Sequence, residues 1–391
     1  MIYFCLIGNL ITEYKDKKMK IMIDARKIGN AGVRTYAVEL VKKILMTDQQ
    51  NKYIILLTKG NSDIVLPPKG NFEVIEGPAN PLLFWLVWNN TVLPYIIKKK
   101  HVHIYHNLKH VTALFNKSKN IITFHSARLF FHPDHYGIIE YLYWKIFQPI
   151  CAKKYNTIIA VSQAEKNHYA DHLNISQKKI KVTHLASADK FKKIDDETLK
   201  KSVKKQFKLP DHFILTVGRI HPVKNMETSI RAFAIAKYQY KIPHKFVIVG
   251  GFSKYLNKLK IIITQEKLEN EVIFTGPIMK ELPVIYNLAD LFLSLSWYES
   301  FHQVSLEAMT CGLPMILSNK GGIPEVFEGV AILHEPDDFK AVADSIAKVL
   351  NSVVMQSEMI NKGLHKAKQF SWGRTVAQTL KTYNYTMNCT G

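Results

Sequence analysis

The chain has 391 residues, of which 47% are hydrophobic and 22% charged, and it carries a formal net charge of +21 at pH 7. These values are those of a soluble globular protein long enough for two domains with separate cores, so they exclude a fold that depends on disulfides. The positive charge favours polyanionic partners. Because no zinc-finger, helix-turn-helix or RNA-binding pattern is present, we expect an anionic membrane surface or a phosphorylated substrate rather than a specific nucleic acid.

The N-terminal residues predict neither a membrane span nor a secretion signal. The apolar run at residues 1–11 is too short to cross a bilayer, and it lacks the basic start and cleavage site of a signal peptide. Met19 begins a better first strand, so we expect residues 1–18 to be an extension or a mis-assigned start. The cysteines stand far apart without CxxC or metal-ligand spacing, which predicts a reduced, cytoplasmic setting. They are Cys5, Cys151, Cys311 and Cys389.

Short apolar runs alternate with helical patterns through residues 19–189, and this alternation predicts a parallel, doubly wound sheet of the Rossmann type. The expected strands are residues 20–25, 53–58, 72–76, 102–107, 120–125 and 157–162. Residues 29–45 are expected to form a glycine-bearing loop that leads into an amphipathic helix. The other expected helical segments are residues 81–100 and 132–155, and a further helix begins at Ala164.

A lysine-rich stretch without a strand pattern, residues 190–210, is interpreted as the linker to a second domain at residues 211–370. A terminal helix is predicted within residues 371–391. We therefore expect an α/β protein of two Rossmann-like domains facing across a cleft. The strands expected in the second domain are residues 213–218, 245–251, 271–276, 291–296 and 314–318, with a helix at 337–352.

Two glutamates surround the turn that follows the expected strand at residues 291–296. Glu299 lies at the carboxyl end of that strand, where open α/β sheets bind ligands. Glu307 falls in the first two turns of the next helix, and the free amides near the start of that helix suit a phosphate. A nucleotide that carries a sugar would satisfy both halves of such a site. On a surface helix, the same two glutamates would simply be solvated.

The two glutamates stand inside ESFHQVSLEAMTCGLPMI, which is followed by GGIPEV, and this arrangement resembles the signature of the family 4 glycosyltransferases, retaining enzymes of the GT-B fold. The resemblance extends from Met19 to Met387. It implies an acceptor-side domain at 19–189, a nucleotide-sugar-binding domain at 211–370 and a terminal helix that crosses back to the first domain. It also implies that Glu299 binds hydroxyls of the donor sugar and that Glu307 binds those of the ribose.

Arg219 and Lys224 follow the first strand of the second domain in GRIHPVKNMETSI, ahead of a helix that Asn225 is expected to cap. Basic side chains at this place reach a diphosphate leaving group and offset the charge that develops as the glycosidic bond breaks. Their spacing matches the phosphate-binding pair of the resembled family. In a lysine-rich chain, the alternative is a pair of ordinary surface charges.

Two further candidates come from the N-terminal half. Gly29 and Gly32 lie on the expected loop after the first strand, where the family places glycines over the donor phosphates; the alternative is a helix-capping turn. His125 ends an expected strand and is followed by the pair His132 and Pro133. By the resemblance, His125 contacts the donor sugar or the transition state, and the alternative is a satisfied polar residue at a strand end.

The turn after Glu299 departs from the family, which commonly has Gly-Phe-Gly there. This chain has Ser300, Phe301 and His302, followed by Gln303, and these four residues are the expected donor-binding turn. Side chains in place of glycine obstruct a close approach of the backbone to phosphate. Either His302 donates to the phosphate, or the chain is an inactive homologue that binds a nucleotide sugar or a partner protein.

No metal and no cofactor are expected besides the nucleotide diphosphate sugar as co-substrate, because basic side chains and helix amides neutralise the diphosphate. Glu325, in GGIPEV, is a secondary candidate whose plain role is to cap the helix that it begins. Four histidines near residue 105 lack an accompanying acid or cysteine, so we expect no metal there. They are His101, His103, His106 and His110.

An aromatic segment with Phe84, Trp85 and Trp88, followed by lysines at 98–100, predicts a core helix with a solvated charged end that also suits a membrane interface. We therefore expect a cytoplasmic hexosyltransferase, peripheral at the inner face of the cell membrane. The expected donor is GDP- or UDP-linked, with mannose among the candidates. The expected acceptor is a glycan or a lipid-linked molecule in the synthesis of cell-surface polysaccharide or lipopolysaccharide.

Overall fold

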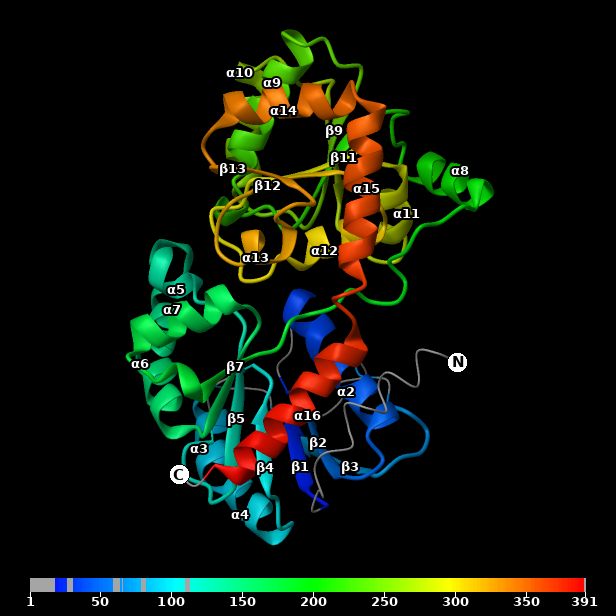
Figure 1. Cartoon of the computed structure of the whole chain (residues 1–391). Helices are drawn as coiled ribbons and strands as arrows, with labels where there is room; N and C mark the ends of the chain where they lie inside the picture. The colour runs from blue at the N-terminus through cyan, green and yellow to red at the C-terminus, as the bar shows by residue number, and fades with distance from the viewer. Residues whose placement is uncertain are drawn as a thin grey trace. The chain divides into compact units, whose positions relative to one another are not determined.

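A computed structural model describes residues 18–26, 31–58, 64, 66–78, 82–109 and 113–389. The chain forms two compact units, which Figure 1 draws with their elements labelled. The smaller unit comprises the described residues up to Thr123, together with Lys154–Ile158 and the described residues from Gln378 onward. The larger unit comprises Phe124–Lys153 and Ile159–Ala377.

The first sheet has seven strands in the order β3-β2-β1-β4-β5-β6-β7. The pairs β1–β2, β1–β4, β2–β3 and β4–β5 are parallel. Its strands are β1 Lys20–Asp24, β2 Lys52–Thr58, β3 Phe72–Gly77, β4 Ile104–Asn107, β5 Lys119–Phe124, β6 Thr157–Ala160 and β7 Ile180–Val182. The helices of this part of the chain are α2 Ala31–Thr47, α3 Leu82–Asn90, α4 Val92–Lys99, α5 Arg128–Phe131, η1 Pro133–His135, α6 Ile138–Lys154, α7 Gln163–Leu173 and η2 Gln177–Lys179.

The second sheet has six strands in the order β10-β9-β8-β11-β12-β13, and all of its pairs are parallel. Its strands are β8 Phe213–Val217, β9 Lys245–Val249, β10 Val272–Gly276, β11 Leu291–Ser294, β12 Met315–Ser318 and β13 Ile332–His334. The helices are α8 Glu197–Gln206, η3 Pro222–Lys224, α9 Met226–Tyr238, α10 Leu256–Gln265, α11 Leu282–Leu288, α12 Gln303–Thr310, α13 Ile323–Phe327, α14 Phe339–Leu350, α15 Val353–Ala367 and α16 Trp372–Asn388.

The prediction of two Rossmann-like α/β domains is confirmed. The central strands are apolar and buried along their whole length, as parallel strands covered by helices on both faces must be. The core of the second sheet includes Ile214, Phe246 and Leu293, packed against Ile230 and Phe233 of α9. Burying such side chains contributes roughly 1.5–3 kcal/mol each, so this core holds the strand ends in place.

The terminal helix crosses back to the smaller unit, as the resemblance implied, since the residues from Gln378 onward belong to that unit. Within the unit, the Tyr383 hydroxyl lies 2.8 Å from Nδ1 of the buried His106, and Thr386 pairs with Thr157 at 2.8 Å. Figure 1 shows the end of α16 running alongside β4 and β5. His106 is therefore a structural residue that anchors this helix.

Several elements differ from the sequence expectation. The lysine-rich linker contains α8, whose start is capped by the Asp196 carboxylate accepting from the amide of Leu199. The strands β7 and β13 were not predicted, and both are only three residues long. Such short strands carry almost no periodic signal and are stabilised by pairing with a longer neighbour. The boundaries given above for the linker and the domains remain predictions.

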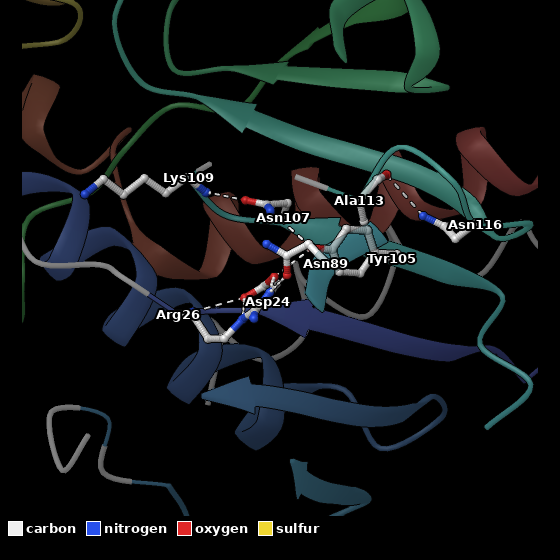
Figure 2. Close-up of polar contacts among 8 residues, drawn as sticks. All are labelled: Asp24, Arg26, Asn89, Tyr105, Asn107, Lys109, Ala113 and Asn116. Carbon is white, nitrogen blue, oxygen red and sulfur yellow. Dashed lines mark hydrogen bonds and ion pairs between the residues drawn. The ribbon is translucent and has the colours of Figure 1, made fainter. Parts of the chain in front are cut away.

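A buried ion pair between Asp24 and Arg26 lies at the carboxyl end of β1 in the smaller unit, as Figure 2 shows. Arg26 donates from Nη2 to Asp24 at 2.6 Å and to the Asn89 side chain at 2.7 Å, and the Tyr105 hydroxyl donates to Asp24 at 2.7 Å. The Arg26 guanidinium also stacks on Trp88 at 4.7 Å. This cluster ties β1 and β4 to α3, in which Trp85 is buried and Phe84 is 54% exposed, so α3 packs in the core on one side only.

None of the helices in the described part of the chain is both long enough and apolar enough to cross a bilayer.

Candidate functional site

The site predicted from the sequence lies where β8 and β11 end in the larger unit. Lys224, on η3 after β8, donates to Glu299 Oε1 at 2.6 Å, and Glu299 follows β11. The two loops are also joined through the backbone, because the amide of Trp297 donates to the carbonyl of Val223 at 2.8 Å. The structure therefore brings Lys224 and Glu299 together from positions far apart in the sequence. Arg219, on the same loop as Lys224, is exposed.

Glu299 is ionised at any ordinary pH. Burial by itself would raise the pKa of this carboxyl, but the Lys224 ammonium and the neighbouring His302 outweigh burial and hold the pKa at about 2. An ionised carboxylate accepts hydrogen bonds and donates none. Its free oxygen therefore suits a pair of sugar hydroxyls.

The turn that carries Glu299 rests directly on the glycine pair before α13. The amide of Gly322 donates to the carbonyl of Glu299 at 2.7 Å. A Cβ built on Gly321 would lie 2.1 Å from the carbonyl oxygen of Glu299, and one built on Gly322 would lie 2.2 Å from that of Ser300. Only glycine allows this approach, so the GGIPEV motif serves to shape the Glu299 turn.

His302 takes the backbone conformation that favours glycine, with φ of 65°, at the start of α12. Its ring is buried: Nδ1 lies 2.6 Å from the Ser305 hydroxyl and Nε2 lies 3.2 Å from that of Ser294. Burial and the nearby Lys224 lower the pKa of His302 to about 4 against the opposing effect of Glu299, so the ring is neutral near pH 7. Both ring nitrogens are thus engaged inside the protein rather than presented at the surface.

The other residues of the turn have distinct surroundings. Phe301 is buried and packs edge-on against Phe370, with ring centroids 5.7 Å apart. Gln303 donates from its side chain to the carbonyl of Ala186 at 3.2 Å. Ser300 lies near the Glu165 carboxyl and acts to lower its pKa against the larger effect of burial. These contacts fix the turn through its side chains. The backbone amides of the turn remain the groups that can contact a phosphate.

Glu307 lies on α12, the helix that follows the Glu299 turn. It is 8% exposed, and the Tyr286 hydroxyl donates to its Oε2 at 3.3 Å. Burial raises the pKa of Glu307 to about 8, against weaker opposing effects of Tyr286 and Lys190. This glutamate is therefore largely protonated near neutral pH, in contrast to Glu299.

Glu325 does not cap the helix that it begins. Its carboxylate accepts from the amide of Gln163 at 2.7 Å and from that of Ala164 at 3.2 Å, at the start of α7, and it pairs with His184 at 2.6 Å. Asn225 also differs from expectation: it has no capping hydrogen bond to α9, and its side chain donates instead to the carbonyl of Pro336 at 2.6 Å. Both polar side chains join segments far apart in the sequence.

A buried carboxyl that was not predicted braces the Glu299 turn. Glu165 is fully buried, accepts from the amide of Ala127 at 2.7 Å, and is bonded by the hydroxyl of Tyr298, the residue before Glu299. Burial raises the pKa of Glu165 to about 7. The sequence offered a signal, since Ser162 and Glu165 have the spacing of a capping box. Ser162 does cap α7, but the Glu165 side chain turns away from it.

The N-terminal candidates are placed less completely. Gly29 lies outside the described residues. Gly32 is in the first turn of α2 rather than on a loop, and it is exposed, with no atom within 4 Å of a Cβ built on it. His125 directly follows β5 and is half-buried in the larger unit, two residues before the Ala127 amide that binds Glu165.

Two protein-family models match this chain, one on each side of the linker region. The family model described as "Glycosyltransferase Family 4" matches residues 31–186, and the one described as "Glycosyl transferases group 1" matches residues 197–366. The chain belongs to the family 4 glycosyltransferases. It is therefore an enzyme of the glycosyltransferase class.

Two curated family relatives illustrate the range of lengths. "O-antigen chain mannosyltransferase B" of Escherichia coli is 26% identical over 268 residues, which cover 67% of this chain and 69% of the relative. "Serotype-specific mannosyltransferase WbdA" of Escherichia coli is 28% identical over 224 residues, which cover 56% of this chain and 28% of the relative. The matched part of this glycosyltransferase thus spans less than a third of WbdA.

Solved structures of glycosyltransferases share the GT-B fold of this chain. Anabaena Alr3699/HepE in complex with UDP-glucose superimposes with a TM-score of 0.75 at 19% identity, over 94% of this chain and 100% of that one. WaaG, a glycosyltransferase involved in lipopolysaccharide biosynthesis, gives a TM-score of 0.71 at 13% identity, over 92% and 99% of the two chains. At these identities, the likeness is one of fold.

Proposed function

We propose that this glycosyltransferase moves a hexosyl group, with mannosyl the first candidate, from a GDP- or UDP-linked donor to a glycan or lipid-linked acceptor. The acceptor would belong to the synthesis of cell-surface polysaccharide or lipopolysaccharide. The curated relatives support the mannosyl assignment, because several of them are named mannosyltransferases and act, by their names, on O-antigen chains. The observation that carries the proposal is the Lys224–Glu299 pair at the ends of β8 and β11.

The diphosphate of the donor would meet Arg219, Lys224 and the amides at the start of α12. Together they offset the charge that grows on the leaving phosphate, so the proposal calls for no metal and no cofactor beyond the nucleotide sugar. Glu299 positions the Lys224 ammonium at 2.6 Å and keeps an oxygen for the sugar hydroxyls. The Glu299 carboxylate would thereby contact both the sugar hydroxyls and the Lys224 ammonium that binds the phosphate.

Glu307 is assigned to the ribose. Two adjacent hydroxyls donating to one carboxylate would favour its ionised form and so draw its raised pKa downward. Donor binding near pH 7 is therefore expected to release a proton from Glu307. His302 supports the turn from inside. A role of Gly29, Gly32 and His125 in donor binding is proposed from the family resemblance alone.

Transfer is assigned retention of anomeric configuration, with front-face attack and the leaving phosphate accepting the proton of the acceptor hydroxyl. Glu299 is engaged with Lys224, which suits a binding role better than that of a covalent nucleophile.

The chain is placed at the inner face of the cell membrane as a cytoplasmic, peripheral protein. The helix α6 supports this, because its apolar side chains recur at every fourth position on an exposed face. The exposed fractions are 71% for Ile138, 46% for Leu142, 54% for Ile146 and 37% for Ile150. Such a face, together with the net charge of +21, suits an anionic bilayer surface.

The test is turnover on a panel of GDP- and UDP-linked hexoses with purified full-length protein, measured as release of the nucleotide diphosphate. Glu299→Ala is expected to lower kcat/KM by roughly 100-fold or more, because it removes the sugar ligand and releases Lys224. Glu358→Ala is the matched control, since it breaks an exposed Lys–Glu pair on α15 and should leave kcat/KM unchanged. Saturable donor binding without turnover would contradict the proposal and indicate an inactive homologue.

A further inference from the structure

A second group of ligating side chains lies at the opposite edge of the second sheet. His212, His244 and Asp290 immediately precede β8, β9 and β11, which are neighbours in the order β9-β8-β11. One ring nitrogen of each histidine and one carboxylate oxygen lie within 4.8 Å of one another. Among the described residues, no other group of three or more histidine, cysteine or acidic side chains converges in this way.

The two nitrogen-to-oxygen distances to Asp290 fit ligands of a shared metal ion better than direct hydrogen bonds. His212 Nδ1 and His244 Nε2 each lie 3.5 Å from Asp290 Oδ2, which is beyond the usual range of a hydrogen bond. In a tetrahedral zinc site with bonds of about 2.0–2.1 Å, the ligand atoms are roughly 3.3–3.5 Å apart. Two imidazoles and one carboxylate are also a ligand set that zinc and its neighbours in the first transition row prefer.

The backbone holds these positions before any ion binds. The amide of Asp290 donates to the carbonyl of Phe213 at 3.0 Å, and the amide of Phe213 donates back to Asp290 Oδ2 at 2.9 Å. The amide of Lys245, next to His244, donates to the carbonyl of His212 at 3.0 Å. A carboxylate oriented by a backbone amide is the kind of support that metal ligands commonly have.

The two histidines of the cluster differ in burial, since His244 is buried and His212 is exposed. His244 is 8% exposed, and among the described residues its Nδ1 has no hydrogen-bond partner. The His212 side chain is 59% exposed, so an ion and a water ligand can reach the cluster from that side. The nearby cation of Lys237 is paired with Glu271 at 2.8 Å.

We propose that His212, His244 and Asp290 together bind one divalent transition-metal ion of the zinc class and so clamp the starts of β8, β9 and β11. The sugar-transfer residues follow the carboxyl ends of β8 and β11. Four or five strand residues separate the two edges, a distance of roughly 15 Å. The ion therefore stabilises the second sheet and takes no part in sugar transfer.

The experiment uses full-length, tag-free protein stripped with EDTA and then titrated calorimetrically with ZnCl₂ alone. One site per chain and a rise in Tm on zinc addition are expected, because an ion that binds the folded state stabilises it. Co²⁺ gives an independent readout, since four-coordinate cobalt has a strong visible absorption that hexa-aqua cobalt lacks.

His212→Asn is the main variant, because its exposed side chain can be replaced without disturbing the core. We expect it to weaken zinc binding at least tenfold and to abolish the cobalt absorption, while its Tm in EDTA equals that of the parent. His365→Gln, an exposed histidine on α15, is the matched control and should bind as the parent does. Absence of saturable binding, or equal affinity of His212→Asn and the parent, would overturn the proposal.

Discussion

At the scale of single residues, the two family glutamates are tuned in opposite directions by their surroundings. Glu299 faces Lys224 and has its pKa held at about 2, whereas Glu307 is buried against Tyr286 and has its pKa raised to about 8. The Glu299 carboxylate is ionised and the Glu307 carboxyl is largely protonated near neutral pH. Two identical side chains thus differ in charge because of their surroundings.

This difference predicts that Glu307→Gln stabilises the free protein at alkaline pH. The folded pKa of Glu307 lies above the ordinary value, so its contribution to stability is present below about pH 4.5 and is lost as pH rises to about 8. Glutamine has no such loss. The free energy of unfolding of the variant should exceed that of the parent by roughly 3–5 kcal/mol at pH 8 and match it near pH 4.5.

Urea unfolding at the two pH values measures this effect, with Glu358→Gln as the exposed control. The same Glu307→Gln variant should bind the donor more weakly. A variant less stable than the parent at pH 8 would show that the buried carboxyl is not a destabilising group. Calorimetry of donor binding in buffers of different ionisation enthalpy tests the proton release proposed for Glu307.

Sequence reasoning at this scale proposed Glu299, Lys224 and Arg219, because each follows a strand end whose position is set by local pattern, and it proposed Glu307 on the helix that comes next. It did not find Glu165. Its spacing from Ser162 is that of a capping box, and only the fold shows that its side chain turns toward Tyr298 and Ala127. A buried contact with a distant segment produces no periodic pattern in the local sequence.

At the scale of elements, the α12 turn and the α13 turn act as one unit. Gly321 and Gly322 lie against the carbonyls of Glu299 and Ser300, and His302 supplies the positive φ where the family commonly has glycine. His302 therefore adopts a backbone conformation that glycine favours while its side chain packs inside the protein. The backbone of His302 shapes the turn, and its side chain supports the turn from inside the protein.

Gly322→Ala should impair transfer more than it impairs folding. The new Cβ would meet the carbonyl oxygen of Ser300 at 2.2 Å, so the turn must shift and move Glu299 from Lys224. We expect kcat/KM to fall at least tenfold with a Tm loss of a few degrees. Gly137→Ala, whose Cβ meets no atom within 4 Å, is the control. Unchanged kinetics in Gly322→Ala would show that the contact does not position Glu299.

At the scale of the whole molecule, net charge and the exposed face of α6 point to the same partner. The chain carries +21, and Ile139 on α6 is 74% exposed. In the proposed membrane-bound state, the positive charge would attract the protein to an anionic surface over a long range, and the apolar side chains would then enter the interface. The electrostatic contribution responds to salt concentration, and the apolar contribution responds to substitution of the exposed side chains.

Binding to phosphatidylglycerol-containing vesicles should therefore weaken with added salt and with loss of the apolar face. Ile139→Ser together with Ile146→Ser is expected to lower vesicle affinity at least tenfold, because each isoleucine contributes roughly 1.5–3 kcal/mol when removed from water. Val354→Ser, 71% exposed on α15, is the control in cosedimentation assays. Equal binding of the double variant and the parent would exclude α6 as the contact.

The sequence by itself determined the two parallel sheets and the family, and it predicted that Glu299, Arg219 and Lys224 follow strand ends and that Glu307 lies on the next helix. It could do so because alternation, strand length and the turn after a strand are local properties. Only the tertiary structure decided that His302 faces inward, that Glu325 caps α7 and that His212, His244 and Asp290 converge. Those outcomes depend on strand order and burial, which bring together side chains separated by tens of residues, and no local pattern encodes which of them will meet.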